Sequence, residues 1–133
     1  MSQADVVCQM VREWSNHDAR KAVSLLADNC EYWDVTQPAP FKSKQEIETF
    51  FKAYFDSFPN VQYEVLRVFT SGDQVACEWR MRGTQEKELD GINGIGKSVD
   101  LVGASLCTVV NNKIVRQIDF WDSGTMLRQL GIS

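Results

Sequence analysis

One acidic side chain near the C-terminus stands in a pattern suited to proton transfer. If residues 113–121 form a strand, alternation puts Gln117, Asp119 and Trp121 on one face. A carboxylate held between an amide and an indole loses solvation, which raises its pKa toward the range useful for general acid/base catalysis. We therefore expect Asp119 to be catalytic. The alternative is that this face of the strand is turned to solvent, where aspartate is common.

A second acidic candidate, Asp34, ends a short aromatic segment that includes Tyr32 and Trp33. A carboxylate at the end of a strand can reach the mouth of a cavity and position or polarise a substrate there, so Asp34 is the second predicted catalytic residue. The alternative is structural, because a carboxylate in front of the loop 36–41 can accept hydrogen bonds from backbone N–H groups of that loop.

Further side chains are predicted to bind a substrate around these carboxylates. Three tryptophans would exclude water from the site, and an amide would position the substrate. The predicted substrate-binding residues are Gln117, Trp33, Trp79, Trp121, Tyr32 and His17. His17 is the only histidine of the chain, and its alternative role is a structural hydrogen bond at the junction of two helices.

The spacing of cysteine, histidine and glycine gives no support for metal or cofactor chemistry. The four cysteines lie more than 20 residues apart, which is not the spacing of zinc or redox motifs. They are predicted to be reduced core residues. The glycine-rich segment 91–97 is predicted to be a crossover or a lid rather than a phosphate cradle, because no helix is expected after it. We predict neither a metal nor a cofactor.

Composition and charge predict a single domain over residues 1–133. The chain has 14 Lys and Arg against 18 Asp and Glu, a formal net charge of -4, which disfavours nucleic acids and anionic membrane surfaces as partners. Its apolar stretches are far shorter than the roughly 20 residues that span a bilayer. Residues 1–12 lack the features of a secretory signal, so we expect a cytoplasmic protein.

Three helices are predicted in the first half of the chain. The first ends near Ser15, and the second follows Asp18 with an apolar stripe that extends to Leu26. The third has the strongest pattern, with large apolar residues at helical spacing between the capping Ser43 and Pro59. The aromatic residues of this helix that are predicted to be ordinary core are Phe50, Phe51, Tyr54 and Phe55.

The second half of the chain has the period of two that is typical of strands. The predicted segments are a strand over 30–35, hairpins over 61–84 and 99–121, a polar loop over 85–97 and a last short helix over 125–130. Helices that are separated from antiparallel strands in the sequence indicate an α+β fold. We expect a curved antiparallel sheet, covered by the N-terminal helices, that encloses a conical cavity.

Four segments together resemble the NTF2-like superfamily, and within it the SnoaL-like polyketide cyclases and the ketosteroid isomerase-like proteins. They are Asn16-His17-Asp18, the run from Leu25 to Asp34, the run from Gly91 to Lys97, and the run from Lys113 through Asp119-Phe120-Trp121-Asp122 to Gly131. The resemblance implies a cone-shaped fold that holds a small apolar ligand. It also implies that Asp119 is the acid/base group, as in cyclases and epoxide hydrolases of the superfamily.

The sequence departs from two enzymes of this superfamily. Ketosteroid isomerases pair a tyrosine of the first helix with an aspartate of the penultimate strand, where this chain has Met10 and the run Ala104-Ser105-Leu106. Epoxide hydrolases use an arginine and an aspartate on one face of the middle strand. Here Trp79 and Met81 are predicted to face inward, so Arg80 would face inward only in the opposite register.

Two main functions are consistent with these residues. One is a small cofactor-independent enzyme that uses general acid/base catalysis on a small hydrophobic carbonyl or epoxide substrate, like a polyketide cyclase or an isomerase. The alternative is a non-catalytic binding or carrier module for a small hydrophobic ligand, and a dimerising domain with a filled cone is a third. The resemblance also implies a homodimer through the sheet, with Ile114, Ile118 and Phe120 on its outer face.

Overall fold

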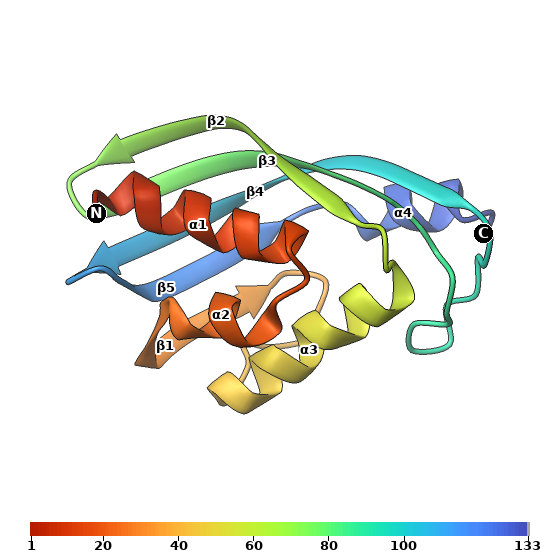
Figure 1. Ribbon diagram of the computed structural model, residues 1–133, viewed down its shortest axis with the longest axis horizontal. Helices are drawn as coiled ribbons and strands as arrows, with labels where there is room; N and C mark the ends of the chain where they lie inside the picture. The colour runs from red at the N-terminus through yellow and green to blue at the C-terminus, as the bar shows by residue number, and fades with distance from the viewer. Residues whose placement is uncertain (133) are drawn as a thin grey trace.

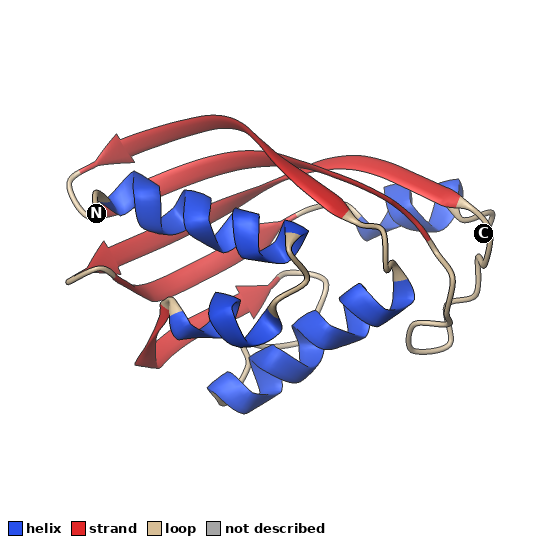
Figure 2. Cartoon of the chain, viewed as in Figure 1, coloured by secondary structure: helices blue, strands red, loops and turns tan. Residues whose placement is uncertain are grey.

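The chain folds into a five-stranded sheet with helices packed against it (Figures 1 and 2). The computed structural model describes residues 1–132. The elements in chain order are α1 (Gln3–Ser15), α2 (Ala19–Ser24), β1 (Leu26–Asp34), α3 (Lys44–Ser57), β2 (Gln62–Ser71), β3 (Gln74–Thr84), β4 (Ser98–Val110), β5 (Lys113–Phe120) and α4 (Ser123–Gln129). The strand order in the sheet is β1-β5-β4-β3-β2. The predicted α+β class is confirmed.

The starts of the helices are fixed by capping side chains. Ser2 accepts a hydrogen bond from the backbone N–H of Asp5, and the carboxylate of Asp5 accepts one from the backbone of Ser2. Asp18, Ser43 and Asp122 cap α2, α3 and α4 in a similar way. These side chains pair N–H groups that a helix start leaves without partners. No helix in the described part of the chain is long and apolar enough to cross a membrane.

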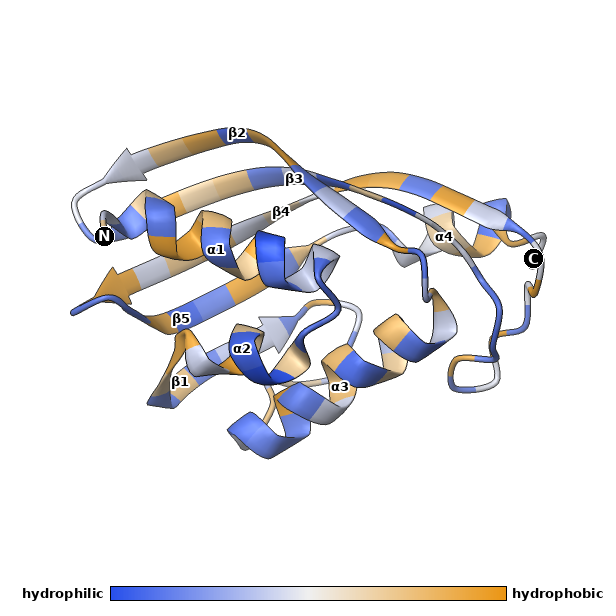
Figure 3. Cartoon of the chain, in the orientation of Figure 1, coloured by the Kyte–Doolittle hydropathy of each residue, from blue (hydrophilic) through white to orange (hydrophobic). Residues whose placement is uncertain are grey.

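The hydrophobic core lies between the helices and one face of the sheet. α1 and α3 alternate hydrophobic and hydrophilic residues along their length (Figure 3). Their apolar residues, among them Met10, Ile47 and Phe51, are buried. α1 packs along β2 and β3, whereas α3 packs against α2 and β1. The two helices therefore cover different parts of the same sheet, and aromatic side chains fill much of the space between them.

The edge strand β1 pairs with β5 in parallel, whereas the other neighbouring strands are antiparallel. This pairing sets Tyr32 opposite Gln117, and Asp34 opposite Asp119. Residues that lie opposite one another in a sheet present their side chains on the same face. The two acidic candidates are thus brought together although they are far apart in the sequence.

The start of β1 differs from the prediction. Leu26 was expected in the second helix and the strand was expected from residue 30, but α2 ends at Ser24 and β1 begins at Leu26. The backbone N–H of Ile114 donates to the carbonyl of Leu25 at 2.9 Å, and Leu26 pairs with Ile114. Pairing with β5 outweighs the local helical pattern, which is only a weak preference.

An irregularity in β5 changes which of its residues face outward. The pairing of β5 with β4 shifts between Arg116 and Ile114, which leaves Val115 as an extra residue. Ile114 is therefore buried in the core, and its predicted place on the outer face was wrong. Phe120 does lie on the outer face and is exposed. A homodimer through this face stays a prediction.

The loop between the two hairpins is organised around one buried side chain. Gln85 is fully buried, and its Nε2 lies within hydrogen-bonding distance of Ser57 Oγ at 3.2 Å and the carbonyl of Ile92 at 2.9 Å. Its Oε1 accepts a hydrogen bond from the backbone N–H of Gly94 at 2.6 Å. Gln85 thus ties the glycine-rich part of the loop to the end of α3.

The same loop has the residue spacing of a phosphate-binding P-loop. Gly91 is followed after four residues by Gly96, Lys97 and Ser98. In a P-loop the lysine and serine lead into a helix, whose N-terminal N–H groups hold the phosphate. Ser98 is instead the first residue of β4. The spacing therefore lacks the helix that would make it a phosphate site.

We expect Gln85→Ala to lower the free energy of unfolding by about 3 kcal/mol, because it leaves buried backbone groups of the loop without partners. Urea denaturation followed by circular dichroism would measure this change. The control is Gln45→Ala at an exposed position of α3, which should change stability by less than about 0.5 kcal/mol. Equal effects of the two variants would contradict the assigned role of Gln85.

Candidate active site

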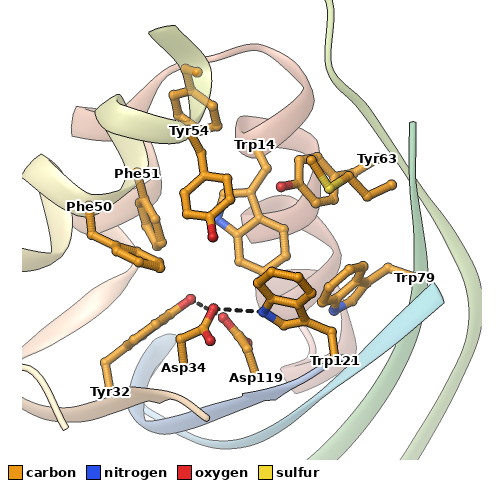
Figure 4. Close-up of a pocket in the computed structure, with 12 residues that line it drawn as sticks. Trp14, Tyr32, Asp34, Phe50, Phe51, Tyr54, Tyr63, Trp79, Asp119 and Trp121 are labelled. Carbon is orange, nitrogen blue, oxygen red and sulfur yellow. Dashed lines mark hydrogen bonds between the residues drawn. The ribbon is translucent and has the colours of Figure 1, made fainter. Parts of the chain in front are cut away.

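An aromatic cavity lies between α3 and the inner face of the sheet (Figure 4). Its volume is about 40 Å³, room for a few water molecules. Nine of its twelve lining residues are aromatic and two are acidic. The lining residues are Trp14, Tyr32, Asp34, Phe50, Phe51, Tyr54, Phe55, Tyr63, Trp79, Met81, Asp119 and Trp121.

Asp119 faces inward from β5 and is 4% exposed. Burial raises the pKa of its carboxyl group to about 6, while hydrogen bonds from Gln117, Ser105 and Tyr32 act in the opposite direction and the charge of Asp34 raises it further. The alternative in which this strand face is turned to solvent is therefore wrong. A carboxyl group with this pKa populates both protonation states near neutral pH.

Tyr32, from β1, donates its hydroxyl hydrogen bond to Asp119 Oδ2. The side chain of Tyr32 is completely buried. Burial raises the pKa of its phenol well above the usual value, and the neighbouring charge of Asp119 raises it further. Tyr32 therefore stays neutral and acts as a hydrogen-bond donor to the carboxylate. The parallel pairing of β1 with β5 is what brings the two side chains together.

Two further donors hold the other carboxylate oxygen of Asp119. Ser105 Oγ donates to Asp119 Oδ1 at 2.6 Å, and Gln117 Nε2 donates to the same atom at 2.8 Å. Ser105 Oγ in turn accepts a hydrogen bond from Trp79 Nε1 at 3.0 Å. Gln117 lies beside the carboxylate and outside the cavity lining. Gln117 therefore orients Asp119 and, contrary to the prediction from the sequence, it does not lie where it could contact a substrate in this cavity.

The structural role that the sequence left open for Asp34 is confirmed, and its catalytic role stays a prediction. It lines the cavity, and its Oδ1 accepts hydrogen bonds from the backbone N–H of Thr36 at 2.9 Å and from Thr36 Oγ1 at 2.6 Å. Its Oδ2 accepts one from Trp121 Nε1 at 2.9 Å, as Figure 4 shows. Asp34 thus holds the loop after β1 and fixes the indole of Trp121 against the cavity.

The aromatic wall is larger than the sequence predicted. Trp79 and Trp121 line the cavity as expected, but so do Phe50, Tyr54 and two further aromatic residues of α3 that were predicted to be ordinary core. Both roles are compatible with helical spacing, because periodicity shows which face of a helix is covered and not whether a cavity lies beneath it. α3 is thus a wall of the candidate site.

Two predicted substrate-binding residues lie elsewhere. Trp33 points to the opposite side of β1 from its neighbours Tyr32 and Asp34, because side chains alternate along a strand, and its Nε1 donates to the carbonyl of Gln37 at 3.0 Å. His17 lies outside the cavity lining, with Nε2 at 2.7 Å from the carbonyl oxygen of Val61. His17 is thus a structural residue of the helix junction.

The charged residues of the middle strand face away from the cavity. Arg80 forms an ion pair with Asp100 at 2.6 Å on the outer face, so the opposite register does not occur. Within the described residues, the cavity lining contains no lysine, arginine or histidine. No group of three potential metal ligands is found there either. Negative charge that develops on a ligand in this cavity must therefore be met by neutral donors.

Sequence reasoning gave no functional role to Ser105 and missed Tyr63, and it did not include Trp14 among the predicted substrate-binding residues. Ser105 pairs directly with Asp119 across β4 and β5. Counted from the Asn111-Asn112 turn alone, Ser105 would lie opposite Ile118, and the extra residue Val115 shifts the pairing by one. Trp14 reaches the cavity from the last turn of α1, where it packs against Tyr63 with ring centroids 5.2 Å apart. No local pattern reveals that contact, because it depends on how α1 lies on β2.

Comparison with known proteins places this geometry in a family. A family model described as SnoaL-like polyketide cyclase matches residues 4–130. No curated protein matches the chain.

Three solved structures are similar over nearly the whole chain. IdmH, a candidate polyketide cyclase from Streptomyces antibioticus, is 21% identical with a TM-score of 0.85, and the match covers 99% of this chain and 100% of IdmH. A candidate SnoaL-like polyketide cyclase from Jannaschia is 16% identical with a TM-score of 0.86, covering 98% and 92%. AclR, a candidate hydroxylase from Streptomyces galilaeus, is 19% identical with a TM-score of 0.85, covering 97% and 95%. Such likeness shows the fold and does not fix a reaction.

The raised pKa of Asp119 predicts the direction in which the stability of the protein changes with pH. Below about pH 4 the group is protonated in both the folded and the unfolded chain, whereas above about pH 6 it is ionised in both. Between these values the unfolded chain loses its proton first, so stability falls as pH rises. We expect this one group to lower the free energy of unfolding by about 3 kcal/mol between pH 4 and pH 7. Asp119→Asn should remove that loss.

Urea denaturation of the wild-type protein and of Asp119→Asn at several pH values would give the difference between their free energies of unfolding as a function of pH. The matched control is Asp122→Asn at the exposed cap of α4. Hydrogen bonds from Thr125 and Gly124 lower the pKa of Asp122, so its contribution is lost as pH falls and has the opposite sign. A difference for Asp119→Asn that does not change with pH would contradict the raised pKa.

Proposed function

Because this chain belongs to the family of SnoaL-like polyketide cyclases, we propose that it is a cofactor-independent enzyme that transfers protons on a small hydrophobic carbonyl compound, with Asp119 as the general acid/base. The observation that carries this proposal is a carboxylate buried in the wall of an aromatic cavity, with its pKa raised to about 6. General acid/base catalysis is most effective when the pKa lies near the working pH.

The proton transfer would use the part of the carboxylate that the protein leaves free. An ionised carboxylate offers about four lone pairs. Hydrogen bonds from Tyr32, Ser105 and Gln117 occupy three of them. The fourth is available to a C–H group next to the carbonyl carbon of a bound ligand. Asp119 would therefore act first as a base, at a position that its neighbours fix.

A cyclisation follows from this step without a further reactant. Asp119 removes the proton, and the electron pair of the C–H bond forms an enolate. The enolate carbon attacks a second carbonyl carbon of the same molecule, forming a C–C bond while the C=O electron pair moves to oxygen. Asp119 then returns its proton to that oxygen. An isomerisation differs only in that the proton returns to another carbon.

A carboxylate in this cavity would lower the stability of a protein that only carries an apolar ligand, without helping it to bind that ligand. Ionisation of Asp119 in the core lowers stability by about 3 kcal/mol. An amide or apolar side chain would hold the same ligand without that loss. Ionisable groups with strongly shifted pKa values in clefts are typical of active sites. This favours catalysis over the carrier alternative.

Asp34 would support the reaction without taking the proton. Its negative charge adds to the effect of burial on the pKa of Asp119. Its hydrogen bond also holds Trp121 against the cavity, which limits the entry of water. Asp34 is thus a positioning residue in this proposal, and Asp119 is the catalytic residue.

The first test is hydrogen exchange on 2-tetralone, a small bicyclic ketone with acidic C–H groups. In D₂O, proton NMR follows the loss of the signals next to the carbonyl. We expect the wild-type protein to accelerate this exchange, and we expect Asp119→Asn to lower the rate by about 10²- to 10⁴-fold. The matched control is Asp122→Asn, which should keep the wild-type rate because asparagine caps a helix as well as aspartate does.

Two results would count against the proposal. One is exchange at the same rate in wild type and Asp119→Asn, which would remove Asp119 from the mechanism. The other is binding of 2-tetralone without any exchange above the buffer rate, which would support the carrier alternative.

The pH dependence of the same exchange is the second test. If Asp119 is the base, kcat/KM rises with pH and reaches half of its plateau near pH 6, because only the ionised form accepts a proton. A half-point near pH 4, the range of an ordinary aspartate, would show that the reacting carboxylate is not buried. A rate that falls as pH rises through 6 would assign Asp119 the role of an acid in the slow step.

A further inference from the structure

The indole N–H of Trp14 is a buried donor with no hydrogen-bond partner. Trp14 is 5% exposed, and its Nε1 has no partner in the described part of the chain. A buried N–H group without a partner is rare in folded proteins, and each one calls for an explanation. The cost of leaving such a donor unsatisfied is large enough for a bound acceptor to be strongly favoured.

The other indoles of the chain show what Trp14 lacks. Trp79 Nε1 donates to Ser105, Trp121 Nε1 to Asp34, and Trp33 Nε1 to the carbonyl of Gln37. Each of these three N–H groups is used within the protein. Trp14 lines the same cavity as Asp119, and Figure 4 shows the nitrogen-bearing edge of its ring turned toward the interior. The nitrogen itself is covered by neighbouring atoms, so a ligand oxygen that reaches it has to displace part of this cover.

The packing around Trp14 fixes the direction of this donor. Its ring makes edge contacts with Phe51 at 6.0 Å and with Trp79 at 5.8 Å between centroids, and it packs on Tyr63. A large ring held from three sides cannot easily rotate to find another partner. The donor is therefore preorganised, and the acceptor has to come to it.

We propose that Trp14 Nε1 donates a hydrogen bond to the carbonyl oxygen of the ligand, and that this bond makes the cavity select neutral carbonyl compounds over hydrocarbons of the same shape. An indole N–H can only donate, so its partner is an acceptor. A carboxylate ligand would be repelled by Asp34 and Asp119, and the lining has no cation to offset that repulsion. A neutral oxygen fits both conditions.

This inference deepens the proposed function, because it rests on the same cavity and assigns its oxygen-binding donor. During proton removal by Asp119, negative charge develops on the carbonyl oxygen. A fixed N–H in a site that excludes water stabilises such charge more than a donor in solvent does. Trp14 and Asp119 would thus act on the two ends of one O=C–C–H unit.

The test compares 2-tetralone with 2-methylenetetralin, in which a CH₂ group replaces the oxygen. In ¹⁵N-labelled protein the Trp14 indole signal is identified by its loss in Trp14→Phe. We expect 2-tetralone to move the Trp14 N–H proton downfield, as a new hydrogen bond does, and 2-methylenetetralin not to do so. Trp14→Phe should weaken the binding of 2-tetralone about ten-fold and change that of 2-methylenetetralin by less than about two-fold.

The matched control is Trp33→Phe, the same substitution at a tryptophan outside the cavity, which should leave both affinities unchanged. If Trp14→Phe does not fold, the Trp14 signal is assigned from nuclear Overhauser contacts to the rings of Phe51 and Tyr63, and the spectra of the wild-type protein then decide the question. Equal shifts of the Trp14 signal with both compounds, or an equal loss of affinity for both in Trp14→Phe, would overturn the inference. So would the absence of 2-tetralone binding at millimolar concentration.

The two proposals fail in different ways. If 2-tetralone shifts the Trp14 signal but its hydrogens do not exchange, carbonyl recognition stands and the catalytic proposal falls. If exchange depends on Asp119 but the Trp14 signal responds to both compounds alike, catalysis stands and the role of Trp14 falls.

Discussion

Keeping one ionisable carboxyl group inside the core is the constraint on which the rest of this structure depends. A buried carboxylate without hydrogen-bond partners would lower the free energy of unfolding by several kcal/mol. Asp119 therefore needs hydrogen-bond donors wherever it is surrounded by protein and not by the cavity. These donors come from three strands, with Tyr32 on β1, Ser105 on β4 and Gln117 on β5. The parallel strand β1 is therefore part of the site as well as an edge of the sheet.

The chemistry of Asp119 results from a balance between burial and hydrogen bonding. Burial raises the pKa of the group, while its three hydrogen bonds lower it, and burial has the larger effect. The aromatic wall supplies the first effect and the sheet supplies the second. Trp79 contributes to both, because its ring covers the cavity while its N–H fixes Ser105. Changes to either layer therefore alter the pKa as well as the shape of the site.

Much of the fold follows from the sequence because its signals are local. Capping residues and periodicity give the helices, and strand alternation correctly turns Asp119 inward. The failures arise where distant segments meet. The bulge in β5 buries Ile114, and pairing with β5 draws Leu26 out of a helical pattern. The free donor of Trp14 exists only because α1 lies across the sheet, so no spacing along the chain could reveal it.

The size of the cavity limits what can enter it without rearrangement. About 40 Å³ is far below the roughly 300 Å³ or more of typical ligand sites. A second hollow of about 240 Å³, between the loop 85–97 and α4, shares Phe50, Tyr54 and Trp121 with the inner cavity. The half-buried Trp121 is held in this shared wall by its hydrogen bond to Asp34. A ligand that spans both spaces must move Trp121 out of this wall. That movement breaks the hydrogen bond between Trp121 and Asp34 and joins the inner cavity to the second hollow. It also takes a hydrogen-bond donor away from Asp34, the carboxylate that lines the inner cavity together with Asp119.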